Sequence, residues 1–379
     1  MKHNRLVVSM ERFQIERYDS IEAAAEVLRA FPSPPFSYQR CSVLCALERS
    51  LKRTVRLHAM AYWGHRGRTA CTGARFRVYV VRDEQNRLVC AAPLQGMGEQ
   101  SWTVVVGKYI FLDTTDFLYA DRPQAELIQA FELVMSRLAA DGVRHLTWFY
   151  LPESSPVATW LTDSGVVPTA EIPNVCISFS EGDAKAYWSC LSRNARQNLK
   201  TAANRMAREG VSARFEFYSA CGLGLPLDTS AGRRVLRRCR SVYVRHQAVR
   251  YGHDRRGVGF FFRHATYVSL SIPGCNGFLC VLWIGDRIGA YMEGYVNERR
   301  QALEVPRLGM DDELARFRPG RLMLKACVEW LAAQSRICRI DLGRGAERYK
   351  YDMGGSTYLT YTISFNPSFC REQTEGGRS

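Results

Sequence analysis

Three arginines surround a proline–glycine pair at the point where a loop is predicted to become a helix. Arg316, Arg318 and Arg321 flank Pro319 and Gly320, and apolar residues recur at helical spacing from residue 322 onwards. Proline is well tolerated in a first helical turn, and the unpaired backbone N–H groups there attract anions. Guanidinium groups bind phosphate oxygens through paired hydrogen bonds. The stretch therefore predicts a site for a phosphate-bearing ligand, although a solvated basic helix start has the same pattern.

Two carboxylates stand where they could take part in proton transfer. Glu293 lies in an apolar predicted strand, residues 287–295, where it is either a buried general base or a solvent-facing side chain. Asp341 ends the predicted strand 337–342, at the edge where open sheets place their ligands. It could receive a substrate amine, pair with Arg344 or cap the next turn. Glu293 and Asp341 are therefore candidate catalytic residues.

The segment after this strand contains further candidates. Arg344 and Lys350 are basic and could hold an acidic substrate group or a phosphate, while Lys350 could equally be a surface residue. Tyr349 could pack beside Tyr351. We treat Arg344 and Lys350 as candidate substrate ligands.

The length of the chain limits the number of domains, and its net charge limits the kind of ligand. The chain has 379 residues, which predicts two domains because a single core seldom grows so large. It carries a net charge of +15, with 52 Lys and Arg against 37 Asp and Glu. Seven arginines fall between residues 233 and 250. Such a field attracts polyanions or phosphorylated small molecules.

The sequence also predicts a compartment and excludes some classes of site. No apolar run reaches the 18 residues of a membrane span, and the N-terminal apolar stretch is too short for a signal peptide. The 13 cysteines are scattered, many within apolar segments, which predicts reduced thiols in a cytoplasmic protein. Cys41, Cys45, His58 and His65 do not match metal-ligand spacing, so no metal is expected.

The order of predicted elements repeats along the chain. Each half shows helices, a three-strand meander, a long helix, a strand, a short segment and a last strand. In the first half these are a meander over residues 74–106, a helix over 123–140, a strand over 146–151 and a last strand over 166–179. In the second they include helices over 233–245 and 260–270, a meander over 277–305, a helix from Pro319, a strand over 337–342 and a last strand over 358–365. We predict an α/β fold with a mixed sheet, in two domains at 1–180 and 181–366, followed by a tail at 367–379.

This layout resembles the Gcn5-related N-acyltransferase (GNAT) fold. The run from Leu191 to Gly210, which begins Leu-Ser-Arg-Asn-Ala-Arg, resembles a helix signature of the BioF2-like, cellulose-biosynthesis-type acetyltransferase family. Arg318-Pro319-Gly320 and the run from Asp341 to Lys350 look like later motifs of that family. Phe317 and Leu322 depart from the general GNAT diphosphate loop. The resemblance covers roughly residues 10–365 and implies two tandem GNAT-like domains with a cleft between them.

The resemblance also implies roles for the candidates. In GNAT-like proteins two neighbouring strands splay to bind the pantetheine arm of acyl-CoA, here residues 301–305 and 337–342. Arg316, Arg318, Gly320 and Arg321 would hold the diphosphate, and Tyr349 would protonate the leaving thiolate. The helix with Arg193 and Arg196 would face an anion beside the cleft. The first half would bind no donor and would contribute Asp116 to the acceptor site.

Three functions follow as hypotheses. The leading one is a cytoplasmic N-acyltransferase that moves an acyl group from acyl-CoA, or an acyl carrier protein, to the amine of a small molecule. Fem-type aminoacyl transferases resemble the same two-domain layout, so an aminoacyl-tRNA donor is the alternative. The third hypothesis is a non-catalytic binding protein that kept the fold and lost the donor site.

Overall fold

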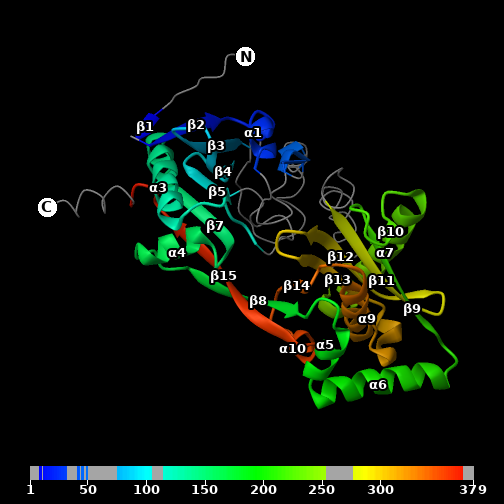
Figure 1. The fold of residues 1–379 in the computed structure, drawn as a ribbon. Helices are drawn as coiled ribbons and strands as arrows, with labels where there is room; N and C mark the ends of the chain where they lie inside the picture. The colour runs from blue at the N-terminus through cyan, green and yellow to red at the C-terminus, as the bar shows by residue number, and fades with distance from the viewer. Residues whose placement is uncertain are drawn as a thin grey trace. The chain divides into compact units, whose positions relative to one another are not determined.

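A computed structural model describes residues 8–10, 12–31, 75–104, 114–252 and 276–369, together with residues 41–49 other than 43 and 47. The chain divides into two compact units. Unit 1 comprises residues 1–172 and 359–379, and unit 2 comprises residues 173–358. Each unit is a mixed sheet with helices packed against it (Figure 1). Among the described residues, no helix is both long and apolar enough to cross a bilayer.

The sheet of unit 1 runs in the order β1-β2-β3-β4-β5-β7-β15, with β6 beside β4. Neighbouring strands are antiparallel except β5 and β7, which are parallel and are separated in sequence by helix α3. The core lies between the sheet and this helix, where Phe131 of α3 meets Phe117 and Trp160. The elements are β1 (Val8–Met10), β2 (Phe13–Tyr18), α1 (Ala25–Arg29), β3 (Phe76–Asp83), β4 (Leu88–Gly96), β5 (Ser101–Val104), β6 (Leu118–Tyr119), α3 (Gln124–Ala140), β7 (His145–Pro152), α4 (Pro156–Asp163) and β15 (Gly355–Phe365).

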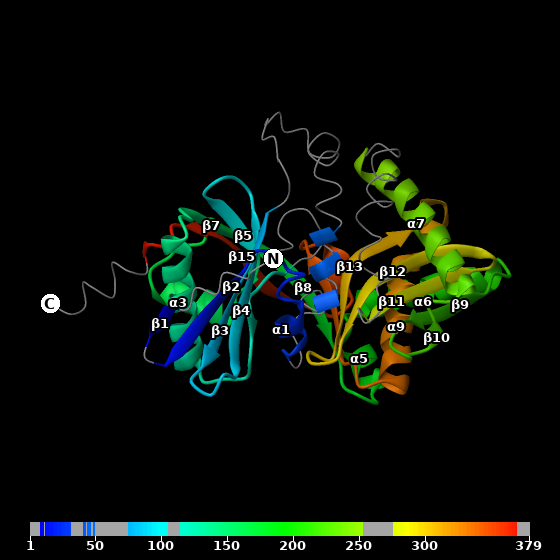
Figure 2. The same cartoon turned by 90° about the horizontal axis from the view of Figure 1, so that it is seen from above.

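The sheet of unit 2 runs in the order β8-β14-β13-β12-β11-β9-β10. The pairs β13–β14 and β9–β10 are parallel, and the remaining pairs are antiparallel. Helices α5, α6 and α9 share one buried core with the sheet, and α7 packs on the sheet through a separate core (Figure 2). The elements are β8 (Ala170–Ser178), α5 (Ala184–Cys190), α6 (Arg193–Arg208), β9 (Ala213–Ser219), β10 (Leu225–Pro226), α7 (Ser230–Tyr251), β11 (Gly277–Ile284), β12 (Arg287–Asn297), β13 (Ala302–Met310), η3 (Asp312–Phe317), α9 (Pro319–Gln334), β14 (Arg339–Arg344) and α10 (Arg348–Asp352).

Most predicted elements of unit 2 are confirmed, with altered ends. The helix predicted from Pro319 is α9, which begins at that residue. The third meander strand, predicted to end at Val305, continues to Met310, and the short helix η3 follows it. Helix α7 begins at Ser230, three residues before its predicted start, because Thr229 caps it by accepting a hydrogen bond from Gly232. A helix predicted over residues 260–270 lies outside the described residues.

The last strand of each half pairs in the other unit. Strand β8 closes the first half of the sequence, yet it pairs with β14 of unit 2. Strand β15 closes the second half, and its residues 360–365 pair with β7 of unit 1. The chain passes from unit 1 to unit 2 between residues 172 and 173 and returns to unit 1 between residues 358 and 359. The sequence predicted one boundary, at 180/181.

Candidate active site

The hydrogen-bonded ladder between β13 and β14 is short. It pairs Ala302–Glu304 with Arg339–Asp341 and stops there, although β13 continues to Met310. Just past the last pair, the register of β13 against β12 shifts by one residue opposite Gly294. A Cβ on Gly294 would overlap the carbonyl oxygen of Glu304, so glycine is required for this bulge. Beyond Glu304, the same edge of β13 forms no further ladder pairs with β14 among the described residues.

Helix α9 begins beside the far end of β13. A Cβ at Gly289 of β12 would lie 3.3 Å from Pro319 Cβ, and one at Gly320 would lie 3.9 Å from Met310 Sδ. Arg318, with φ 52° and ψ 51°, ends η3 and precedes α9 in the left-handed region. Within the described residues, no side chain caps the start of α9. Pro319 has no N–H, and the N–H groups of Arg321 and Leu322 donate to the Arg318 carbonyl at 3.1 and 3.2 Å. Among the described groups, the first turn therefore offers the Gly320 N–H and a positive dipole end, at the far end of β13.

The three arginines around this turn differ in their contacts. Arg316 pairs with Glu209 at 3.1 Å and lies over the Phe317 ring, 4.5 Å from its centroid. Arg321 donates to Asp352 of α10 at 2.5 Å, and its Nη1 is buried with no hydrogen-bond partner among the described residues. Arg318 is exposed, and no ion pair ties it to another residue in the described part of the chain. Arg318 is thus the side chain best placed to meet an incoming anion.

Two sets of contacts hold helix α10: one to the start of α9 and one to the loop after β14. Asp352 joins it to Arg321 at the start of α9. Lys350 is buried and donates to the carbonyls of residues 342, 343, 344 and 345 at 2.7–3.3 Å, with Glu347 3.0 Å away. Lys350 is therefore neither a surface residue nor directed at a substrate; it shapes the loop after β14. Tyr349, the residue before Lys350, is half-buried against the core that α9 shares with the sheet.

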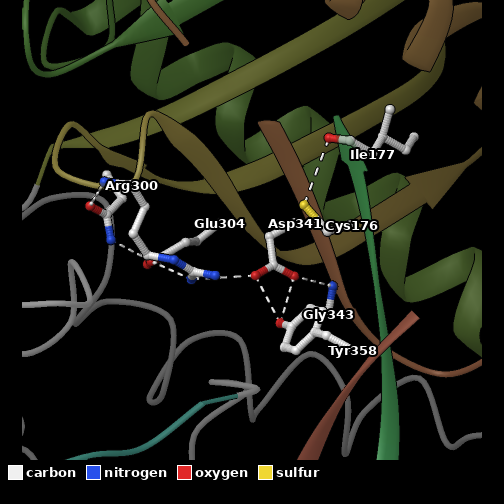
Figure 3. A network of polar contacts seen from close by, with 8 residues as sticks. Cys176, Ile177, Arg300, Glu304, Asp341, Gly343 and Tyr358 are labelled. Atoms are coloured by element: carbon white, nitrogen blue, oxygen red, sulfur yellow. Dashed lines mark hydrogen bonds and ion pairs between the residues drawn. The ribbon is translucent and has the colours of Figure 1, made fainter. Parts of the chain in front are cut away.

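Asp341 lies at the end of the β13–β14 ladder within a polar network (Figure 3). Its carboxylate accepts hydrogen bonds from Tyr358 at 2.8 and 2.9 Å and from the Gly343 N–H at 3.0 Å. Arg300 lies 3.5 Å from Asp341 and 3.5 Å from Glu304. Burial opposes the charge of Arg300, but Glu304 and Asp341 outweigh this effect and raise the guanidinium pKa. Asp341 is thus an oriented group at the point where the ladder ends.

Cys176 of β8 lies directly beside this carboxylate, since it is the register partner of Asp341. Burial, followed by the charge of Asp341, raises the pKa of the Cys176 thiol to about 12. The thiol is therefore protonated at neutral pH and is a poor nucleophile. This position does not support a cysteine-linked intermediate.

Glu293 is fully buried, which excludes the solvent-facing alternative. It lies opposite Arg307 in the β12–β13 register, and the Arg307 Nε to Glu293 Oε1 distance is 2.7 Å. Arg240 of α7 adds a second guanidinium, with its Nε 3.6 Å from Glu293 Oε2. Two cations thus hold one buried carboxylate beneath α7.

The remaining predicted residues occupy separate places. Arg193 is exposed at the start of α6, and Arg196 donates to the Ser189 carbonyl at 2.8 Å. This corner of α5 and α6 adjoins α10, since Tyr187 donates to the Met353 carbonyl at 3.0 Å. Arg344 ends β14, half-buried. Asp116 lies in unit 1.

Asp116 is buried in unit 1 and accepts hydrogen bonds from the Phe117 N–H at 2.8 Å and from Tyr119 at 3.3 Å. Burial raises the pKa of Asp116 to about 7, against the opposing effect of its hydrogen bonds. The carboxyl thus titrates near neutrality, which the sequence did not indicate.

Sequence reasoning missed Arg300, Glu304 and Tyr358. Arg300 was assigned to a turn and Glu304 to the strand 301–305, so neither was linked to Asp341. The available signal was the pairing of predicted strands 301–305 and 337–342, which places Glu304 and Asp341 on neighbouring strands.

Comparison with known proteins bears on the second unit. Residues 193–351 match the family model described as an acetyltransferase (GNAT) domain. No curated protein sequence matches the chain. The C-terminal domain (DUF2156) of a putative lysylphosphatidylglycerol synthetase from Agrobacterium fabrum is similar in structure, with a TM-score of 0.52, 10% identity and coverage of 91% of this chain and 92% of that one. A tandem GNAT protein from the clavulanic acid biosynthesis pathway has a TM-score of 0.44, 10% identity and coverage of 93% and 98%.

The predicted mixed α/β, GNAT-type fold is confirmed. The match over residues 193–351 spans α6 to α10 and includes the β13–β14 ladder, α9 and Asp341. The chain carries a GNAT acetyltransferase domain and is an acyltransferase.

Proposed function

We propose that this acyltransferase moves an acyl group from acyl-CoA to the amine of a small acceptor. The observation that carries the proposal is the short parallel ladder that stops at Glu304 and Asp341, with the uncapped start of α9 at the far end of β13. The pantetheine arm of acyl-CoA can pair with backbone groups that a strand leaves unpaired, and a helix N-terminus binds a diphosphate. Here β13 has an edge beyond its ladder with β14, and α9 begins at the far end of the same strand. The helix motif from Leu191 to Gly210 further supports a BioF2-like relationship.

The donor's diphosphate would lie on the first turn of α9. Gly320 has room for a Cβ, with only Met310 Sδ near it at 3.9 Å, so packing within the protein does not explain the glycine. Close approach of a phosphate to the backbone does explain it. Arg318 would neutralise the phosphate, and Arg321 would hold the turn in place through Asp352.

The acceptor amine would lie at Asp341. The amine nitrogen attacks the thioester carbonyl, the carbon–sulfur bond breaks, and the thiolate takes a proton as it leaves. Asp341 would bind the incoming ammonium and align it, and the ammonium would lose one proton to solvent before its nitrogen attacks. Tyr349 of α10 would supply the proton to the thiolate and would regain one from the nitrogen as the amide forms. The loop between them is shaped by Lys350, so the two groups are held by one local structure.

The donor site can be tested with Gly320→Ala. Wild-type protein is expected to melt at a higher temperature with acetyl-CoA or a longer acyl-CoA, because ligand binding stabilises the native state by about 2.7 kcal/mol at 100 times Kd. Gly320→Ala should fold as well as wild type, since the new Cβ meets only Met310 Sδ at 3.9 Å and alanine restricts the unfolded chain more than glycine does. It should nevertheless lose most of the acyl-CoA stabilisation. Differential scanning fluorimetry and an acetyl-transfer assay measure both properties.

The control for this variant is Gly98→Ala in unit 1, where the new Cβ also meets nothing closer than 3.8 Å. Gly98→Ala should bind acyl-CoA as wild type does. Normal donor binding in Gly320→Ala would remove the α9 start from the donor site. If neither acyl-CoA nor acyl carrier protein stabilises the wild type, the donor proposal fails.

The exposed arginines of helix α7 favour a second candidate donor, aminoacyl-tRNA. This helix contains no acidic residue, and its exposed side chains include five arginines. Arg238 also donates to the Asp286 carbonyl at 3.3 Å and lies 4.9 Å from the Trp283 ring centroid. The exposed arginines are Arg233, Arg234, Arg237, Arg238 and Arg245.

If this face binds tRNA, replacing Arg233 and Arg237 with alanine should weaken binding and flatten its salt dependence. Each phosphate contact contributes roughly 0.7–0.9 to the slope of log K against log salt, so the slope should fall by about 1.5. Gel shifts with aminoacyl-tRNA over a salt series measure it. Arg12 and Arg144, exposed in unit 1, provide the control pair. Equal losses in both pairs, or no tRNA binding at all, would count against this donor.

The cytoplasm is the compartment we propose. The cysteines described are all free thiols, and two close pairs, Cys41–Cys45 and Cys280–Cys327, have sulfurs 3.7 and 3.8 Å apart without a bond. A reducing environment is consistent with such pairs.

A further inference from the structure

Tyr358 is outside the motifs that suggested the function, yet it makes the shortest contacts of the Asp341 carboxylate. Its hydroxyl lies 2.9 Å from Oδ1 and 2.8 Å from Oδ2 (Figure 3). The residue is half-buried near the start of β15 and is the last residue of unit 2. A phenol that donates to a charged carboxylate makes a stronger hydrogen bond than a neutral pair would.

The other partners of Asp341 show what this contact achieves. The Gly343 N–H binds Oδ1 at 3.0 Å, but the Arg300 guanidinium remains 3.5 Å from Oδ2. Arg300 is itself held elsewhere, because its backbone N–H donates to Asn297 at 3.1 Å and its side chain is shared with Glu304. Asp341 is therefore not drawn into a close, two-pronged ion pair with Arg300. Tyr358 and Gly343 hold the carboxylate instead.

We propose that Tyr358 is a positioning residue that orients Asp341 toward the acceptor amine. The proposal rests on the proposed N-acyltransferase function and on the role of Asp341 in it. An ammonium group binds a carboxylate through the lone pairs that other donors leave open, so the direction of those lone pairs decides where the nitrogen sits. Without the phenol, Asp341 can turn toward Arg300, and the nitrogen loses its alignment with the thioester. Tyr358 thus acts on the acceptor side of the reaction only.

The test is Tyr358→Phe in the full chain, which removes one oxygen and keeps the ring. The value of kcat/KM for the acceptor amine should fall about 10- to 100-fold, as expected for loss of a hydrogen bond to a charged group. The KM for acyl-CoA and the rise in melting temperature with acyl-CoA should not change. Tyr351→Phe is the matched control, because its phenol also contacts a side chain, Thr357 Oγ1 at 2.9 Å, on the same stretch of chain. Tyr351→Phe should behave as wild type.

A double-mutant cycle with Asp341→Asn separates positioning from general structure. If Tyr358 acts through Asp341, adding Tyr358→Phe to Asp341→Asn should cost little further activity. Additive losses, wild-type kinetics in Tyr358→Phe, or an equal loss of donor binding would each overturn the proposal. If Tyr358→Phe melts far below wild type, Tyr358→His retains a ring and a donor. Recovery of acceptor kcat/KM in the histidine variant supports positioning, and no recovery overturns it.

Failure of the proposed function gives a different result. In that case the wild type shows neither acyl-CoA stabilisation nor transfer to any amine, and the variants cannot be ranked by turnover. The Tyr358 proposal fails by itself only when the wild type is active and Tyr358→Phe matches it.

Discussion

A chain that begins at residue 181, the domain boundary predicted from the sequence, is expected not to fold its second unit. It lacks β8, which is the antiparallel partner of β14 and places Cys176 opposite Asp341. It also lacks the buried side chains of Val175, Ile177 and Phe179. Each such apolar side chain contributes about 1.5–3 kcal/mol by burial, and domains are stable by only about 5–15 kcal/mol in total. Loss of the strand should therefore unfold the unit.

A chain spanning residues 168–358 is the matched comparison, since it retains β8 and all of unit 2. It should give a cooperative melting transition by circular dichroism and elute as a compact species, whereas residues 181–379 should not. Should both fail to fold, Ile177→Asn in the full chain tests the same contact, because this side chain is fully buried on β8. A cooperative transition for residues 181–379, equal to that of residues 168–358, would contradict the strand assignment.

The exchange of last strands could not be predicted from the sequence for a physical reason. Alternating apolar and polar residues identify a strand and its buried face, but they do not name the strand beside it. Residues 166–179 and 358–365 were both recognised as strands, and each was assigned to the half that precedes it. Partner choice depends on contacts far apart in sequence, such as Asp341 with Cys176.

Features that depend on a short stretch of sequence were predicted better than the pairing of distant strands. The Pro319 start of α9 was recognised because proline tolerance and helical periodicity are properties of the segment itself. The end of β13 was placed too early because Pro306 breaks a strand pattern. The structure accommodates this proline at the bulge opposite Gly294, a residue on another strand.

The roles of charged residues were the hardest to predict, because they depend on what lies opposite. Lys350 was assigned to substrate or surface, yet four carbonyls of the loop after β14 surround its ammonium group. Arg316 was assigned to the donor phosphate, and Glu209 at the end of α6 pairs with it. Glu209 is 107 residues from Arg316. The carbonyls around Lys350 are only five to eight residues away, but they belong to the backbone, so no side-chain motif indicates them.

Glu293→Gln is expected to destabilise the protein strongly while leaving the chemistry of the folded fraction largely intact. The wild-type carboxylate is fully buried between Arg307 and Arg240. Removing its charge leaves two guanidinium groups without compensation, and breaking a buried ion pair in this way costs about 3–5 kcal/mol. Urea unfolding should show a lower midpoint. Glu298→Gln, an exposed glutamate on the next turn, should change the midpoint little.

This variant separates two roles that the sequence left open for Glu293. A general base would lose kcat by about 100-fold or more on amidation with no comparable change in stability. A structural carboxylate loses stability and keeps kcat per folded molecule. The two guanidinium groups favour the second role, because each contacts one of the carboxylate oxygens that a base would turn toward the substrate. Kinetics corrected for the folded fraction, measured beside the urea midpoint, decide between the roles; a large fall in kcat at unchanged stability would restore Glu293 to the catalytic set.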